Sequence, residues 1–84
     1  MARQRRDAVL AKVLDRRGGV SFRDLQSLLK RLGFSHERTR GSHLIYTHPR
    51  VFRPLSIQAK GNEAKRYQLD QLRDIISEFH LLDE

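Results

Sequence analysis

The spacing of the apolar residues changes twice along this chain, and each change predicts a change of secondary structure. Between residues 22 and 32 the apolar side chains recur at helical spacing, which predicts a helix with one buried stripe. Between residues 34 and 58 the pattern alternates, which predicts strands over 34–40, 43–48 and 51–58. The helical spacing returns from about residue 67 to residue 79. The chain therefore combines helices with a sheet.

Glycine, proline and serine mark where these elements begin and end. A shorter helical pattern over residues 5–17 precedes the others, and Gly18-Gly19 is expected to end it. Ser21 is expected to cap the second helix, and Gly33 to end it in the left-handed conformation. Pro54 predicts that the third strand lies at an edge or contains a bulge. Residues 59–66 are polar and predict a loop.

The predicted order is α-α-β-β-β-α, which belongs to the α+β class. Strands joined by short turns predict a three-stranded antiparallel sheet, with the helices packed on one face and the other face open to a ligand. Residues 1–84 suffice for a single small domain. The chain contains no cysteine, so a disulfide framework and a thiolate metal site are excluded.

The charge of the chain favours an anionic partner. Seventeen Lys and Arg against ten Asp and Glu give a net charge of +7, which points to nucleic acid. The alternative is a basic surface without a partner. No apolar run approaches the ~20 residues of a membrane span, so no membrane association is predicted. No secretion signal is recognised either, and the expected location is the cytoplasm.

His43 stands at the first position of the second predicted strand, directly after the turn at Gly41 and Ser42. Alternation along the strand places His43 on one face, and Leu44 and Tyr46 on the other. Imidazole can take up or release a proton near neutral pH, so His43 is the candidate catalytic residue. The alternative is a structural strand histidine. In the third strand, Ser56 and Gln58 share one face, and Leu55 and Ile57 share the other.

Several short motifs together resemble the HicA-type toxin family across residues 20–80, and the helix over 5–17 precedes this region. They are Gly33-Phe34, then Arg40-Gly41-Ser42-His43-Leu44-Ile45-Tyr46 with His48-Pro49, and finally Gly61, Ala64-Lys65 and Tyr67-Gln68. The resemblance implies a fold similar to a double-stranded-RNA-binding domain. It also implies a ribonuclease that cleaves messenger RNA, is inhibited by a HicB-type antitoxin and uses His43. Many members carry a second histidine after the third strand, whereas residues 56–60 contain none.

RNA cleavage by its own 2′-hydroxyl needs a proton acceptor, cations near the phosphate and a proton donor. We assign His43 to proton transfer without a metal or other cofactor. Tyr67 is the candidate for stacking on a base, and Tyr46 is expected in the core. His48 is interpreted as a turn residue and His36 as an exposed strand residue. The predicted RNA-binding residues are Arg38, Arg40, Gly41, Ser42, Lys60, Lys65, Arg66 and Tyr67.

Two other functions are compatible with the sequence. A non-catalytic module of the double-stranded-RNA-binding type would use the basic residues but would not need His43. A protein-interaction domain would use its positive charge only for acidic partners.

Overall fold

The computed structural model describes residues 7–82 and confirms the order α-α-β-β-β-α. The main sheet is antiparallel with the strand order β1-β2-β3, as predicted for a meander. Arg5 and Arg6, the first residues of the predicted N-terminal helix, lie outside the described residues. In chain order the elements are α2 (Ala8–Leu14), α3 (Phe22–Arg31), β1 (Ser35–Arg40), β2 (His43–His48), β3 (Val51–Ile57), β4 (Ala59–Lys60), β5 (Glu63–Ala64) and α4 (Arg66–Glu78).

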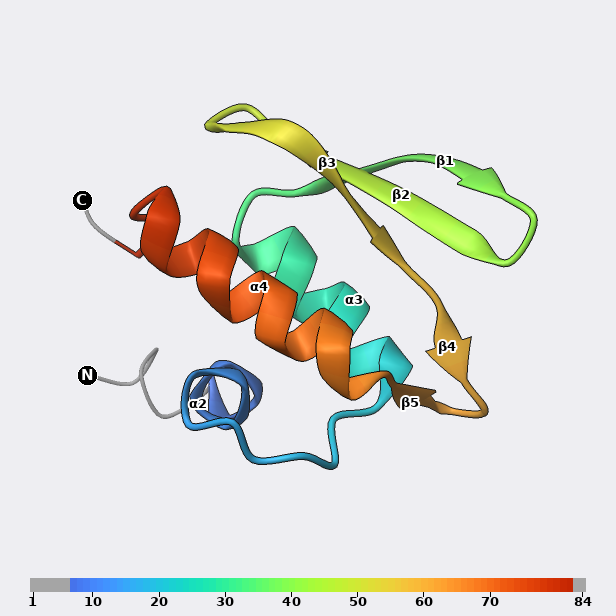
Figure 1. Cartoon of the computed structure of the whole chain (residues 1–84), viewed down its shortest axis with the longest axis vertical. Coiled ribbons are helices and arrows are strands. Elements are labelled where there is room, and N and C mark those ends of the chain that lie inside the picture. The colour runs from blue at the N-terminus through green and yellow to red at the C-terminus, as the bar shows by residue number, and fades with distance from the viewer. Residues whose placement is uncertain (1–6, 83–84) are drawn as a thin grey trace.

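The elements form three layers (Figure 1). Helices α3 and α4 lie on one side of the main sheet, and α2 lies on the far side of these two helices (Figure 1). Strand β1 is exposed along its whole length, while β2 and β3 each turn alternate residues toward the helices. The prediction that the helices cover one face and leave the other open is therefore confirmed.

The core fills the space between these layers. Leu55 and Ile57 of β3 are both fully buried, which confirms that they share the inner face. Leu14, which was predicted in the first apolar stripe, is 38% exposed because it ends the short helix α2. The buried apolar residues are Val13, Val20, Leu25, Leu28, Leu29, Phe34, Tyr46, Val51, Leu55, Ile57, Leu69, Leu72, Ile75 and Ile76.

The first described helix ends earlier than the sequence predicted. Helix α2 stops at Leu14 rather than near Gly18, because Arg16 takes the left-handed conformation with φ of 60°. The Arg17 amide donates to the Lys12 carbonyl and the Arg16 amide to the Val13 carbonyl, which is the Schellman pattern. An arginine thus occupies the position where glycine is usual. At the end of α3 the same pattern uses Gly33, as predicted.

The segment over residues 59–66 was predicted as a loop, and this prediction is wrong for residues 59–60 and 63–64, which are strands. Residues 59–60 and 63–64 form the hairpin β4–β5, with Lys60 opposite Glu63. The hairpin also bonds to the chain before α3, since the Phe22 amide donates to the Asn62 carbonyl and the Ala64 amide to the Val20 carbonyl. These partners lie about forty residues apart in the chain, so local sequence signals cannot reveal the pairing.

His48 at the end of β2 connects the sheet to the end of α3. Its Nδ1 accepts a hydrogen bond from the Arg50 amide at 3.0 Å, so Nε2 carries the hydrogen and donates to the Leu32 carbonyl at 2.8 Å. The side chain is buried against the Phe34 ring, with 4.9 Å between ring centroids. The interpretation of His48 as a turn residue is therefore wrong. It is a buried strand residue whose two nitrogens both bond to the backbone.

Replacing Gly33 is expected to disturb this connection. A Cβ at residue 33 would lie 2.9 Å from Nε2 of His48, and the backbone there has φ of +101°. We expect Gly33→Ala to lower the free energy of unfolding by roughly 3 kcal/mol, through backbone strain and displacement of His48. Gly19→Ala is the matched control, since φ is +77° but no atom lies within 4 Å, and roughly 1 kcal/mol is expected. Urea unfolding measures the free energy of unfolding of both variants. An equal loss in Gly33→Ala and Gly19→Ala would contradict the role of His48.

Candidate functional site

The open face of the sheet gathers the catalytic candidate and two arginines. Arg40 pairs with His43, and Arg38 pairs with Ile45, so these side chains share one face. Ile45 in turn pairs with Ser56 of β3. The alternate pair, Leu44 with Ile57, belongs to the inner face. The strand register therefore brings Arg38, Arg40, His43 and Ser56 to the face turned away from the helices.

The imidazole of His43 is exposed and held from one side. Its Nδ1 lies 3.2 Å from the Ser56 hydroxyl oxygen, which is hydrogen-bonding distance. Nε2 has no hydrogen-bond partner within residues 7–82. The ring is thus anchored on the rigid sheet through one nitrogen, and the other nitrogen is available to a ligand.

A second chain of hydrogen bonds joins the β1–β2 turn to the start of α4. The Gln58 amide nitrogen donates to the Ser42 hydroxyl at 2.6 Å, and the Lys65 ammonium donates to the Gln58 carbonyl oxygen at 2.8 Å. The Lys65 ammonium also lies 6.0 Å from the centroid of the Tyr67 ring, which is 58% exposed. Gln58 therefore connects two of the predicted binding residues, Ser42 and Lys65, beside the turn that precedes His43, and Lys65 lies near a third, Tyr67.

The remaining predicted residues occupy different places. Gly41 forms the turn with φ of +60°, a conformation that favours glycine. Lys60 is exposed on the β4–β5 hairpin. Arg66 extends toward the end of α2, where its guanidinium donates to the Arg16 carbonyl at 2.9 Å. Arg66 is thus the one predicted cation whose hydrogen bond is directed toward the helical layers.

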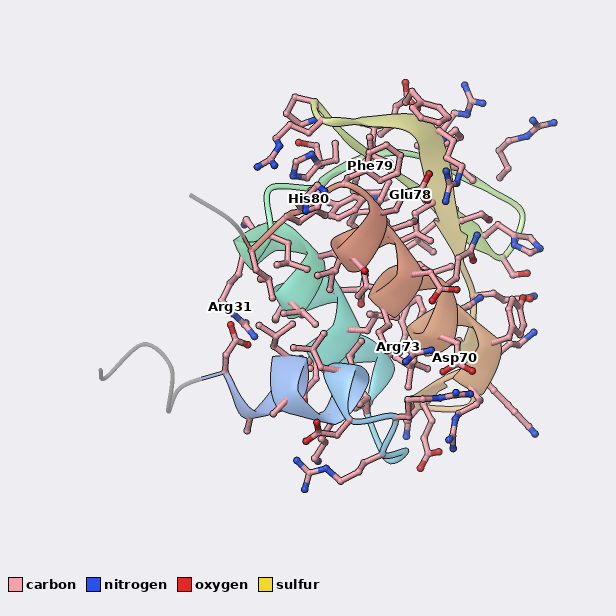
Figure 2. All side chains as sticks on the ribbon, turned by 60° about the vertical axis from the view of Figure 1, so that its left-hand side comes forward. Arg31, Asp70, Arg73, Glu78, Phe79 and His80 are labelled. Carbon is pink, nitrogen blue, oxygen red and sulfur yellow. The ribbon has the colours of Figure 1, made fainter. Side chains whose placement is uncertain are left out.

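The positive charge on the open face is not neutralised locally. Among the described residues, neither Arg38 nor Arg40 has a carboxylate within ion-pair distance. Other arginines do have such partners, and Arg31, Asp70 and Arg73 belong to the helical part of the molecule (Figure 2). On β3, a hydrogen bond to Glu78 raises the pKa of the exposed Arg53 above its ordinary value. The ion pairs are Arg16–Asp70, Arg17–Asp15, Arg31–Asp7, Arg53–Glu78 and Arg73–Asp74.

The other strand histidines belong to the helix-facing side of the sheet. His36 stacks on Tyr46 with ring centroids 5.2 Å apart, and Tyr46 is buried, as predicted. His43 and His48 point to opposite faces, as the alternation predicted. On this side, Arg23 and Lys30 line a groove of about 760 Å³ between α3 and β1. No group of three or more metal-binding side chains occurs within residues 7–82.

Sequence reasoning did not select Ser56 and Gln58 as site residues. Their alternation with Leu55 and Ile57 placed them on the outer face, but nothing in the sequence showed which side chains they would meet. That information depends on the register between β2 and β3, which pairs Leu44 with Ile57. With that register known, the diagonal contact between Ser56 and His43 is expected.

Comparison with known families agrees with the local motifs. A family model described as the HicA toxin of bacterial toxin–antitoxin systems matches residues 22–77, which include every element from α3 to most of α4. Helix α2 lies before the matched segment. No curated protein and no solved structure matches the chain significantly. No helix within the described range is long and apolar enough to cross a bilayer.

Gln58→Ala removes both bonds that connect the β1–β2 turn to Lys65. We expect the free energy of unfolding to fall by about 1 kcal/mol, since exposed hydrogen bonds contribute little net stability. The backbone order parameters at Gly41 and Ser42 should fall from about 0.85 toward 0.6, as measured by ¹⁵N relaxation. Gln26→Ala is the matched control, because its amide bonds to the Tyr46 hydroxyl on the other side of the sheet. A turn that stays equally rigid in both variants would contradict the connection.

Proposed function

The chain belongs to the HicA toxin family of bacterial toxin–antitoxin systems, and from this premise we propose that it is an endoribonuclease that cleaves messenger RNA through His43. The observation that carries the proposal is the His43 imidazole, anchored at Nδ1 by Ser56 and exposed beside two arginines that have no carboxylate partner in the part of the chain that the structure describes. A titratable ring on a rigid strand, surrounded by cations, suits proton transfer at a phosphate. RNA would lie on the open face of the sheet.

The reaction proposed is transfer of the phosphate to the neighbouring 2′-oxygen. His43 takes the proton of the 2′-hydroxyl, whose oxygen attacks phosphorus and forms a cyclic 2′,3′-phosphate. The bond from phosphorus to the 5′-oxygen breaks, and that oxygen receives a proton from water or from the imidazolium. Arg38 and Arg40 offset the negative charge that develops on the phosphate oxygens. Each step uses a proton or a fixed charge, so the scheme needs no cofactor.

The other predicted residues would bind the rest of the RNA strand. Lys65, Ser42 and Lys60 would contact phosphates beyond the reacting one, and a base would stack on the exposed ring of Tyr67. Arg66 would contact RNA only if the strand extended toward α2. Because phosphate contacts dominate such binding, its affinity should fall steeply with salt.

As a toxin, the protein functions with an antitoxin, and we propose that this partner is of the HicB type. The antitoxin would neutralise the enzyme by covering His43 or the basic residues around it. An acidic antitoxin segment would complement the net charge of +7. The toxin would encounter both messenger RNA and the antitoxin in the cytoplasm.

His43→Ala is expected to lower the rate of RNA cleavage by about 100-fold or more, because it removes the group that transfers the proton. The measurement expresses each variant at matched levels without antitoxin, and follows growth and the length of one messenger RNA. His36→Ala is the matched control, since it removes an exposed imidazole on the other side of the same sheet. Equal cleavage by wild type and His43→Ala would show that the active residue lies elsewhere. If wild type and His43→Ala both bind RNA and neither cleaves it, the non-catalytic module is favoured.

Arg38→Ala/Arg40→Ala should weaken binding of single-stranded RNA and make it less dependent on salt. Losing two phosphate contacts should reduce the slope of log affinity against log salt by roughly 1.4, at about 0.7 per contact. Arg23→Ala/Lys30→Ala is the matched control, since it removes the same charge from the groove beside α3. Fluorescence titration at several salt concentrations measures both. A larger loss in the control would place the RNA on the helical side.

A further inference from the structure

We infer that Ser56 is a positioning residue, which holds His43 in the tautomer with hydrogen on Nδ1 and thereby presents Nε2 to the RNA as the base. The inference rests on the proposed function. It goes further by naming the nitrogen that reacts and the side chain that selects it. The contact is the 3.2 Å approach of the Ser56 hydroxyl to Nδ1.

The position of Ser56 is fixed by the core beneath it. Its neighbours Leu55 and Ile57 are fully buried, so residue 56 must point to the open face. The pairing of Leu44 with Ile57 and of Ile45 with Ser56 then sets Ser56 diagonally across from His43. A diagonal pair is within reach of a long side chain such as histidine.

The tautomer decides whether His43 can accept a proton at Nε2. A neutral imidazole carries one hydrogen, and the bond made by one nitrogen determines the state of the other. When the Ser56 oxygen accepts from Nδ1–H, the lone pair on Nε2 faces the RNA. After Nε2 takes the 2′-hydroxyl proton, both nitrogens carry hydrogen and the Nδ1–H bond to Ser56 stays in place. The site therefore needs no rearrangement during the transfer.

The other groups around His43 cannot replace Ser56 in this task. Arg40 faces it from β1, with Arg38 next along the strand, and guanidinium groups donate hydrogen bonds without accepting any. Beyond β3, the Gln58 amide already bonds to Ser42 and Lys65, and the Lys65 ammonium is again only a donor. Among the described residues, Ser56 is the one side chain within hydrogen-bonding distance of this ring, and its hydroxyl oxygen has the acceptor capacity that these cations lack.

The tautomer can be measured without RNA. ¹⁵N-labelled protein is examined by NMR at a pH where His43 is neutral, with the ring assigned by comparison with His43→Ala. Wild type and Ser56→Thr, which keeps the hydroxyl on a β-branched side chain suited to a strand, should show hydrogen on Nδ1. Ser56→Ala should shift the population toward hydrogen on Nε2. Wild type with hydrogen on Nε2, or no shift in Ser56→Ala, would overturn the inference.

Cleavage kinetics give the second readout. Ser56→Ala should lower kcat by about 3- to 10-fold, the equivalent of one neutral hydrogen bond, and leave KM unchanged. Ser56→Thr should restore kcat. Ser35→Ala, in β1, is the matched control and should behave as wild type. An unchanged kcat in Ser56→Ala, or an effect confined to a higher KM, would overturn the positioning role.

The two proposals fail in different ways. If His43→Ala cleaves RNA as well as wild type does, the proposed function loses its catalytic residue, and the ring spectra still decide whether Ser56 selects the tautomer. If His43→Ala is inactive while Ser56→Ala matches wild type in spectrum and rate, the proposed function stands and the inference about Ser56 is wrong.

Discussion

Beside the shared apolar core, one hydrogen bond of His48 connects the sheet to α3, and a second holds the imidazole in place. One reaches the carbonyl of Leu32 at the end of α3, and the other comes from the Arg50 amide in the β2–β3 turn. Arg50 adds a second connection, since its guanidinium donates to the carbonyls of Phe79 and His80 at the end of α4. Strand β1 buries no side chain, so its own packing contributes little. The orientation of the open face therefore depends on the buried residues of β2 and β3 together with these polar contacts at the helix ends.

Two histidines of one strand thus meet opposite conditions. His48 uses both ring nitrogens for backbone bonds and lies in the core, so it cannot transfer a proton to a ligand. His43 uses one nitrogen and remains exposed. The alternation of a β-strand produces this division, because the odd separation of the two residues turns them to opposite faces. One histidine of β2 thus stabilises the fold, and the other is the residue proposed for proton transfer.

Periodicity was sufficient to predict the helices, the strands and the faces of Leu55, Ile57 and Tyr46, because burial repeats with the geometry of each element. It was not sufficient where distant segments meet. The β4–β5 hairpin depends on bonds to residues 20 and 22, and the early end of α2 depends on Arg16 taking a conformation typical of glycine. At the candidate site, His43, Arg38 and Arg40 were selected from alternation and motif, and their role stays a prediction. Ser56 and Gln58 required the register between strands.

The exposed edges of the sheet carry features that disfavour pairing with a second strand. An open strand edge offers unpaired amides and carbonyls to any second strand, including one from another copy. Along β1, charged and polar side chains and an irregular pairing between His36 and Arg38 make such addition unfavourable. Along β3, Pro54 removes a donor. Both edges thus disfavour the strand-to-strand aggregation to which small sheets are prone.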